Sequence, residues 1–139
     1  ADVVMKSGIP LTMCGLEVTH QALVIKPIFA KLEAMWTDLS KTVIGLLKFF
    51  ASTYNDVFEM PDPPLHDPVA VALLIDRSVV KTRRSNVEIE LNGKFTRGAT
   101  VVDIYNRSGS AANVDVALEL DFDKFWSMML DAVAKAGKA

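Results

Sequence analysis

The sequence lacks the features that mark several classes of protein. Its single cysteine among 139 residues, Cys14, excludes an internal disulfide and suits a reducing compartment. No apolar run reaches the ~18 residues that span a bilayer, and no secretory signal stands at the amino terminus. With 15 basic and 17 acidic residues, the formal net charge of -2 lacks the excess of positive charge that non-specific nucleic-acid binding needs. We therefore expect a soluble, cytoplasmic protein that binds neither membranes nor nucleic acids.

Common catalytic and nucleotide-binding motifs are absent as well. The sequence contains no G-x-S-x-G, Walker A or G-x-G-x-x-G pattern. No spacing of cysteine and histidine suggests a zinc site. Only two histidines occur, His20 and His66. Few residues therefore remain as candidates for acid–base chemistry.

What is present predicts one α/β domain. Half of the residues are hydrophobic and 23% are charged, which excludes a disordered chain, and the length suits a single domain. The spacing of apolar residues and first-turn prolines predicts helices over 27–35, 38–54, 69–75 and 121–135. Alternating or short continuous apolar runs predict strands over 9–16, 87–91, 100–105 and 114–120.

Local signals add detail between these elements. The strand over 9–16 is expected to be buried in a parallel sheet, and Cys14 within it reads as an inert core thiol. Residues 81–84 (KTRR) read as a solvated connector rather than a phosphate site. Asn92-Gly93 predicts a tight hairpin turn.

The first residues allow two interpretations. Residues 1–6 look helical and end before Gly8, yet no capping residue precedes them. They form either a frayed terminal helix or the end of a longer helix within which the chain begins.

His66 and Asp67 form the most suggestive pair. They follow a rigid proline-rich loop, residues 60–64, and Asp67 is predicted to cap a helix whose first residue is Pro68. A helix amino terminus favours a neutral imidazole, which could pass a proton to a leaving group. Asp67 could be one oxygen ligand of Ca²⁺, an ion that takes about six to eight oxygens. From these residues alone, capping and packing are favoured over catalysis.

Two further polar groups lie near helix ends. Thr19 is predicted to cap a short helix through Leu23, with His20 hydrogen-bonded beside it. Tyr54 ends the long helix before the proline-rich loop and could belong to a lid. On spacing alone, a surface or core aromatic is the favoured interpretation of Tyr54.

Several separated segments resemble the inosine–uridine-preferring nucleoside hydrolases. The similarity covers almost the whole chain in the same order, and it looks closest to the non-specific enzymes of kinetoplastid parasites. The segments are 7–20 (SGIPLTMCGLEVTH), 64–76 (PLHDPVAVALLID), 93–103 (GKFTRGATVVD), 113–121 (NVDVALELD) and 125–126 (FW).

The resemblance implies a fold, a reaction and roles for residues. The fold is an open mixed sheet with helices packed on it and a small antiparallel element. The reaction is hydrolysis of the N-ribosidic bond of purine and pyrimidine ribonucleosides to ribose and free base, in nucleoside salvage, with bound Ca²⁺ holding the ribose and a water. By motif match, His66 would protonate the departing base, Asp67 would ligate Ca²⁺, and Tyr54 would fall in a lid over the base.

Two motifs of that family have no counterpart in the sequence. They are an aspartate cluster, D-T-D-P-G-x-D-D, and a ribose-binding segment like N-A-E-F-N. We therefore expect residues 1–139 to be the C-terminal portion of such a domain, inactive alone and poor at binding Ca²⁺. An exposed sheet edge would favour a homo-oligomer, or cover by the missing N-terminal part. Two alternatives stay open: a non-catalytic interaction module or antigen, and a site completed by a separate chain.

Overall fold

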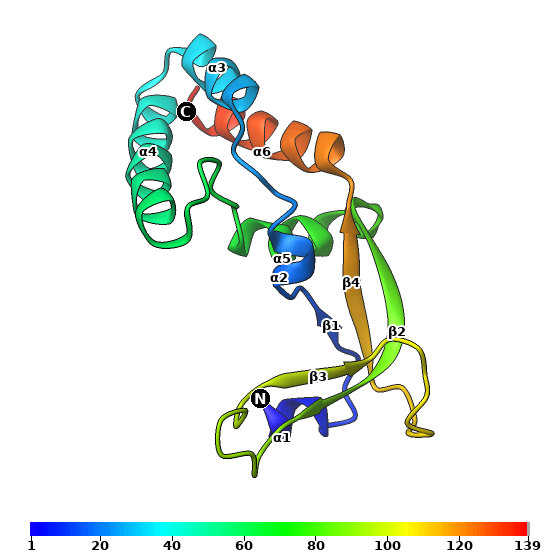
Figure 1. The fold of residues 1–139 in the computed structure, drawn as a ribbon. Coiled ribbons are helices and arrows are strands. Elements are labelled where there is room, and N and C mark those ends of the chain that lie inside the picture. The colour runs from blue at the N-terminus through cyan, green and yellow to red at the C-terminus, as the bar shows by residue number, and fades with distance from the viewer. Residues whose placement is uncertain (139) are drawn as a thin grey trace.

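The computed structural model describes residues 1–138 as helices around a curled, mixed sheet (Figure 1). The sheet has the order β1-β4-β2-β3, in which β1 runs parallel to β4 while β2 is antiparallel to both of its neighbours. This arrangement confirms the predicted α/β class. The elements are α1 (Asp2–Met5), β1 (Thr12–Met13), α2 (Leu16–Thr19), α3 (Lys26–Met35), α4 (Asp38–Phe58), α5 (Asp67–Ile75), the 3₁₀ turn η1 (Arg77–Val79), β2 (Val80–Ile89), β3 (Thr100–Asp103), β4 (Val114–Leu120) and α6 (Phe122–Ala136).

Helices α3 to α6 form a body at one end of the sheet, and most of the core lies inside that body. Helix α6 packs on α3, α4 and α5, and its Phe125 and Trp126 are buried. Leu32 of α3 and Leu47 of α4 complete this contact. Among residues 1–138, no helix is long and apolar enough to cross a membrane.

Clear local signals set the starts of three of these helices. Pro27 lies in the first turn of α3, as predicted. At the start of α4, the Ser40 N–H donates to the Thr37 side chain and the Thr37 N–H donates to the Ser40 hydroxyl, a reciprocal cap. The Asp121 carboxylate accepts the Lys124 N–H at the start of α6.

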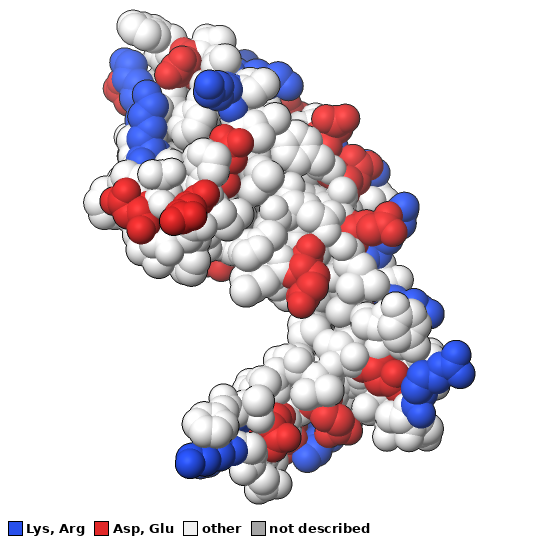
Figure 2. Space-filling model, viewed as in Figure 1, with Lys and Arg blue, Asp and Glu red and all other residues white. Residues whose placement is uncertain are grey.

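Strands β2 and β3, together with α1, form an arm that projects from the helical body. Asn113 joins these pieces, because its amide accepts from the Val87 N–H and donates to the Met5 and Val87 carbonyls, at 2.8–3.1 Å. In Figure 2 the visible face is hollowed between the arm and the body. Acidic and basic side chains alternate over that face, so it carries no broad patch of one sign.

Two predicted elements are different in the structure. The strand expected over 9–16 shrinks to Thr12–Met13, which pairs in parallel with β4 as predicted but is not buried. Pro10 and Gly15 flank it, and neither favours a longer strand. Residues 81–84 are not a connector, because they belong to β2. There the Lys81 ammonium lies 2.6 Å from the Glu119 carboxylate on the neighbouring strand.

The hairpin between β2 and β3 is also longer than predicted. The strands pair antiparallel from Ile89 opposite Thr100, so residues 90–99 connect them instead of a two-residue turn at Asn92-Gly93. The Glu90 carboxylate accepts both of those N–H groups, at 2.6 and 2.9 Å. Backbone hydrogen bonds between Glu90 and residues 98 and 99 close the connection, and the Glu90 side chain holds Asn92 and Gly93 within it.

Candidate functional site

The proline-rich loop places His66 against the end of α2. The Val24 N–H donates to the Pro63 carbonyl at 3.0 Å, and the Leu65 N–H donates to the Ala22 carbonyl at 2.9 Å. Pro63 and Pro64 are fully buried. This short ladder holds the segment that precedes α5 in a fixed register beside residues 22–24.

Both ring nitrogens of His66 have hydroxyl partners. Nδ1 lies 2.8 Å from Oγ1 of Thr19, at the end of α2, and Nε2 lies 2.6 Å from the hydroxyl of Tyr54, in α4. A hydroxyl can donate or accept a hydrogen bond. Either neutral tautomer, and the imidazolium as well, can therefore keep both contacts.

The surroundings of His66 favour the neutral ring. Burial lowers its pKa below the ordinary value of 6.5, and repulsion from His20 adds to that effect, while the nearby Asp67 carboxylate opposes it. The two imidazole rings lie 5.4 Å apart between centroids. His20 itself is exposed, so it forms the solvent side of this pair.

Tyr54 belongs to a row of aromatic rings on α4. Its ring lies 4.7 Å from that of Phe50 and 5.0 Å from that of Phe58, as expected for residues four apart on a helix. Helix α4 continues to Phe58, one turn beyond the predicted end. Tyr54 is therefore part of a helical face rather than a terminal residue.

The prediction that Asp67 caps α5 is wrong. His66 is the capping position and adopts helical backbone angles, φ -68° and ψ -68°, so the helix already includes Asp67 and makes no side-chain cap. Thr19 likewise ends α2 and caps nothing, since Gly15 precedes that helix. Within residues 1–138 the exposed Asp67 carboxylate has no hydrogen-bond or ion-pair partner.

A cavity of about 390 Å³ lies beside these groups. Its lining includes Thr19, His66 and Asp67, with Cys14, which follows β1, and Leu16, the first residue of α2. Burial raises the pKa of the Cys14 thiol, so this group stays protonated at neutral pH. The predicted acid, His66, and the predicted metal ligand, Asp67, thus line the same cavity. Tyr54 is hydrogen-bonded to the imidazole.

The residues present do not make a calcium site by themselves. In the described part of the chain, no group of three or more His, Cys, Asp or Glu side chains could hold a metal ion. Asp67 offers at most two carboxylate oxygens, against the six to eight or so that Ca²⁺ takes.

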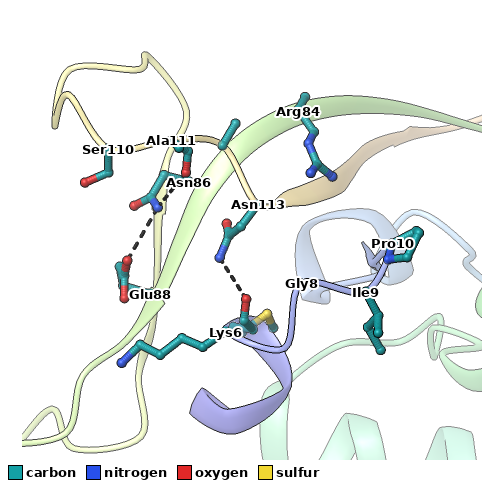
Figure 3. A pocket seen from close by; sticks show the side chains of 12 residues that line it. Lys6, Gly8, Ile9, Pro10, Arg84, Asn86, Glu88, Ser110, Ala111 and Asn113 are labelled. Atoms are coloured by element: carbon teal, nitrogen blue, oxygen red, sulfur yellow. Dashed lines mark hydrogen bonds between the residues drawn. The ribbon is translucent and has the colours of Figure 1, made fainter.

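A larger cavity, of about 690 Å³, lies at the arm and contains none of the predicted site residues. Figure 3 shows side chains of both charges around it, among them Lys6, Arg84 and Glu88. The Asn86 amide there donates to the Ala111 carbonyl at 3.1 Å. Such hydrogen bonds within the arm stabilise the fold. The larger volume of this cavity therefore does not identify it as the functional site.

The sequence analysis selected His66, Asp67 and Tyr54 as candidates but missed the contact between Thr19 and His66. The two residues are 47 positions apart, and Thr19 ends its helix with a side chain only 5% exposed. No pattern of residue types signals such a contact, because it depends on how the 60–66 segment returns to α2.

Comparison with known proteins places this geometry in context. The family model for the inosine-uridine preferring nucleoside hydrolases matches residues 1–127. A probable ribonucleoside hydrolase of Dictyostelium discoideum is 39% identical, over 96% of this chain and 41% of that protein. The inosine-uridine preferring nucleoside hydrolase of Crithidia fasciculata is 38% identical, over 99% and 44%.

A solved structure agrees with these sequence matches. The purine-preferring ribonucleoside hydrolase from Gardnerella vaginalis superposes with a TM-score of 0.84 at 28% identity, covering 99% of this chain and 44% of that one. The chain thus spans less than half the length of the relatives that it matches.

Proposed function

This chain belongs to the inosine-uridine preferring nucleoside hydrolase family, and from that membership we propose that it carries the leaving-group side of a site that hydrolyses the N-ribosidic bond of ribonucleosides. The observation that carries the proposal is the imidazole of His66, bonded through both nitrogens to hydroxyls and facing a cavity. The proposed setting is nucleoside salvage in the cytoplasm, with purine and pyrimidine ribonucleosides as substrates.

His66 acts as the proton donor in this proposal. When the bond between ribose and base breaks, the electron pair moves to a ring nitrogen of the base, which then takes up a proton. Only the imidazolium can give a proton and end as a stable neutral ring. Because Tyr54 occupies Nε2, the proton passes to the Tyr54 hydroxyl, which releases its own proton toward the base.

The ribose side of the reaction needs groups that this chain does not hold. Asp67 is proposed as one oxygen ligand of Ca²⁺ beside the cavity, but a single carboxylate does not make the site. We therefore propose that residues 1–139 form the C-terminal portion of the enzyme, and that alone they bind Ca²⁺ poorly and do not hydrolyse nucleosides. We call this chain joined to the remaining part of the family fold the complete enzyme.

The decisive experiment measures ribose release from inosine and uridine, with Ca²⁺ and with a chelator. We expect release from the complete enzyme, loss of release in its His66→Ala variant, and none from the 139-residue chain. Tyr105→Ala, a change to an exposed side chain outside the site, is the matched control and should retain activity. Chelator-sensitive release by the pure chain would contradict the proposal that it is inactive alone. A silent complete enzyme would favour a non-catalytic interaction module.

A further inference from the structure

The side chain of Thr19 makes a hydrogen bond that its position at the end of a helix does not explain. The Thr19 N–H already donates to the Gly15 carbonyl, and the Thr19 carbonyl accepts the Ala22 N–H. Its hydroxyl caps neither end of α2. In the described part of the chain, its one hydrogen-bond partner is Nδ1 of His66, at 2.8 Å.

The backbone around Thr19 is held firmly to the sheet. Its neighbour Val18 is fully buried in the core. The Gln21 amide donates to the Leu118 carbonyl at 2.7 Å and accepts the Leu120 N–H at 2.9 Å, which ties the end of α2 to β4. Thr19 therefore presents its hydroxyl from a fixed position, whereas the Tyr54 hydroxyl reaches the same ring from another helix.

A hydroxyl suits a ring that must gain and lose a proton. It accepts from Nδ1–H in the imidazolium and either donates or accepts in the neutral ring, so the contact survives each protonation state without a ring flip. A carboxylate at the same place would stabilise the imidazolium strongly. An apolar side chain would leave Nδ1 without a partner. The ring could then turn either of its nitrogens toward Tyr54.

We propose that Thr19 is a positioning residue that holds the His66 imidazole with Nε2 directed at Tyr54. This inference rests on the proposed function, in which His66 is the proton donor. Thr19 touches neither substrate nor metal in this scheme. It acts only through His66.

The first test measures the ring nitrogens of His66 by ¹⁵N NMR in the 139-residue chain, over a pH titration. Thr19→Val keeps the shape of the side chain but removes the bond. We expect the ¹⁵N shift of His66 Nδ1 to move toward that of a nitrogen without a hydrogen bond. Thr19→Ser should stay near the unmodified chain. Thr82→Val, the same change at an exposed site in β2, should have no effect.

The same spectrum keeps the inference testable if Thr19→Val does not fold. In the unmodified chain, the ¹⁵N shift of His66 Nδ1 should be that of a hydrogen-bonded nitrogen, with the exposed His20 as reference. A shift typical of a free nitrogen would overturn the inference. So would a folded Thr19→Val chain in which the ¹⁵N shifts of the His66 ring are unchanged.

The second test is kinetic and uses the complete enzyme. Thr19→Val should lower kcat for inosine about 10- to 100-fold with KM little changed, as for a misdirected reacting group, and Thr19→Ser should restore most of it. If Thr19→Val moves the His66 signals but the complete enzyme hydrolyses no nucleoside, the proposed function fails while the contact stands. If hydrolysis is normal in Thr19→Val, the inference fails and the proposed function stands.

Discussion

The Tyr54 hydroxyl lies 2.6 Å from Nε2 of His66, on the opposite side of the ring from the Thr19 hydroxyl at Nδ1. The imidazole is therefore hydrogen-bonded to α4 and to α2 at once. The contact joins the last turns of α4 to His66, the residue at the N-cap position of α5. Its consequence for the proposed reaction is that protons leave or enter His66 through a phenol.

Tyr54→Phe tests that consequence directly. The phenylalanine keeps the packing against Phe50 and Phe58 but removes the hydroxyl. In the complete enzyme we expect turnover of inosine to fall about 100-fold, while the free energy of unfolding changes by only about 1 kcal/mol. Tyr105→Phe, at an exposed tyrosine of the arm, is the control. Wild-type turnover in Tyr54→Phe would show that protons reach the base by another route.

The pH dependence of activity follows from the environment of His66. Burial lowers its pKa below 6.5, and the proposed donor is the imidazolium. The rate of base release should therefore fall as pH rises through the pKa of His66. A kcat profile that is flat between pH 5 and pH 8, measured with inosine, would argue against His66 as the donor.

Stability should vary with pH in the opposite sense. The pKa of His66 is lower in the folded chain than in the unfolded one, so the unfolded chain takes up the proton first as pH falls. The stability that the neutral ring contributes is present above pH 6.5 and is lost as pH falls through the folded pKa. Urea unfolding at several pH values should show this slope in the 139-residue chain, and His66→Ala should flatten it. His20→Ala should reduce the slope, because it removes a like charge.

Asp103 provides a second, independent pH effect. Its carboxylate accepts the N–H groups of Arg107 and Ser108, at 2.9 and 2.7 Å, and these bonds lower its pKa to about 2. The contribution to stability is therefore present above pH 3.8 and is lost as pH falls toward 2. Asp103→Asn should lower the urea midpoint at pH 7. Asp131→Asn, at an exposed position in α6, should not.

The exposed apolar residues of helix α5 indicate that the chain self-associates. Leu74 is 86% exposed and Ile75 is 75% exposed, while the adjacent Leu73 is buried in the core. A helix that is apolar on all sides is normally covered. The 139-residue chain should therefore bind a dye specific for apolar surface and self-associate, and Leu74→Glu should weaken both. Leu73→Ala should instead cost about 2–5 kcal/mol of stability. A monomer in sedimentation without dye binding would contradict this expectation.

Much of the helical body could be predicted because its signals are local. Pro27 and Asp121 mark the starts of α3 and α6, and the apolar spacing over 121–135 predicts the helix that buries Phe125 and Trp126. The strands were harder to place. The apolar run over 9–16 contributes only two paired residues, because Pro10 and Gly15 interrupt it, and the charges of 81–84 hid a strand whose partners lie on β4.

The candidate site was predicted in part. The resemblance identified His66, Asp67 and Tyr54, and the structure brings the imidazole to Tyr54 and to the same cavity as Asp67. Their chemical roles remain predictions. The bond from Thr19 could not be found in the sequence, because it depends on the ladder between residues 22–24 and the proline-rich loop.

That ladder also divides the candidate site into a part that backbone hydrogen bonds fix and a part that they do not. Thr19 and His66 are attached to backbone segments that hydrogen-bond to one another, whereas Tyr54 stands on the far side of a loop that the ladder does not include. Insertions or deletions over 59–62 would leave intact the two backbone hydrogen bonds that hold the segment before His66. The link between the aromatic row of α4 and the proline-rich loop can therefore vary while the backbone that carries Thr19 and His66 keeps its register.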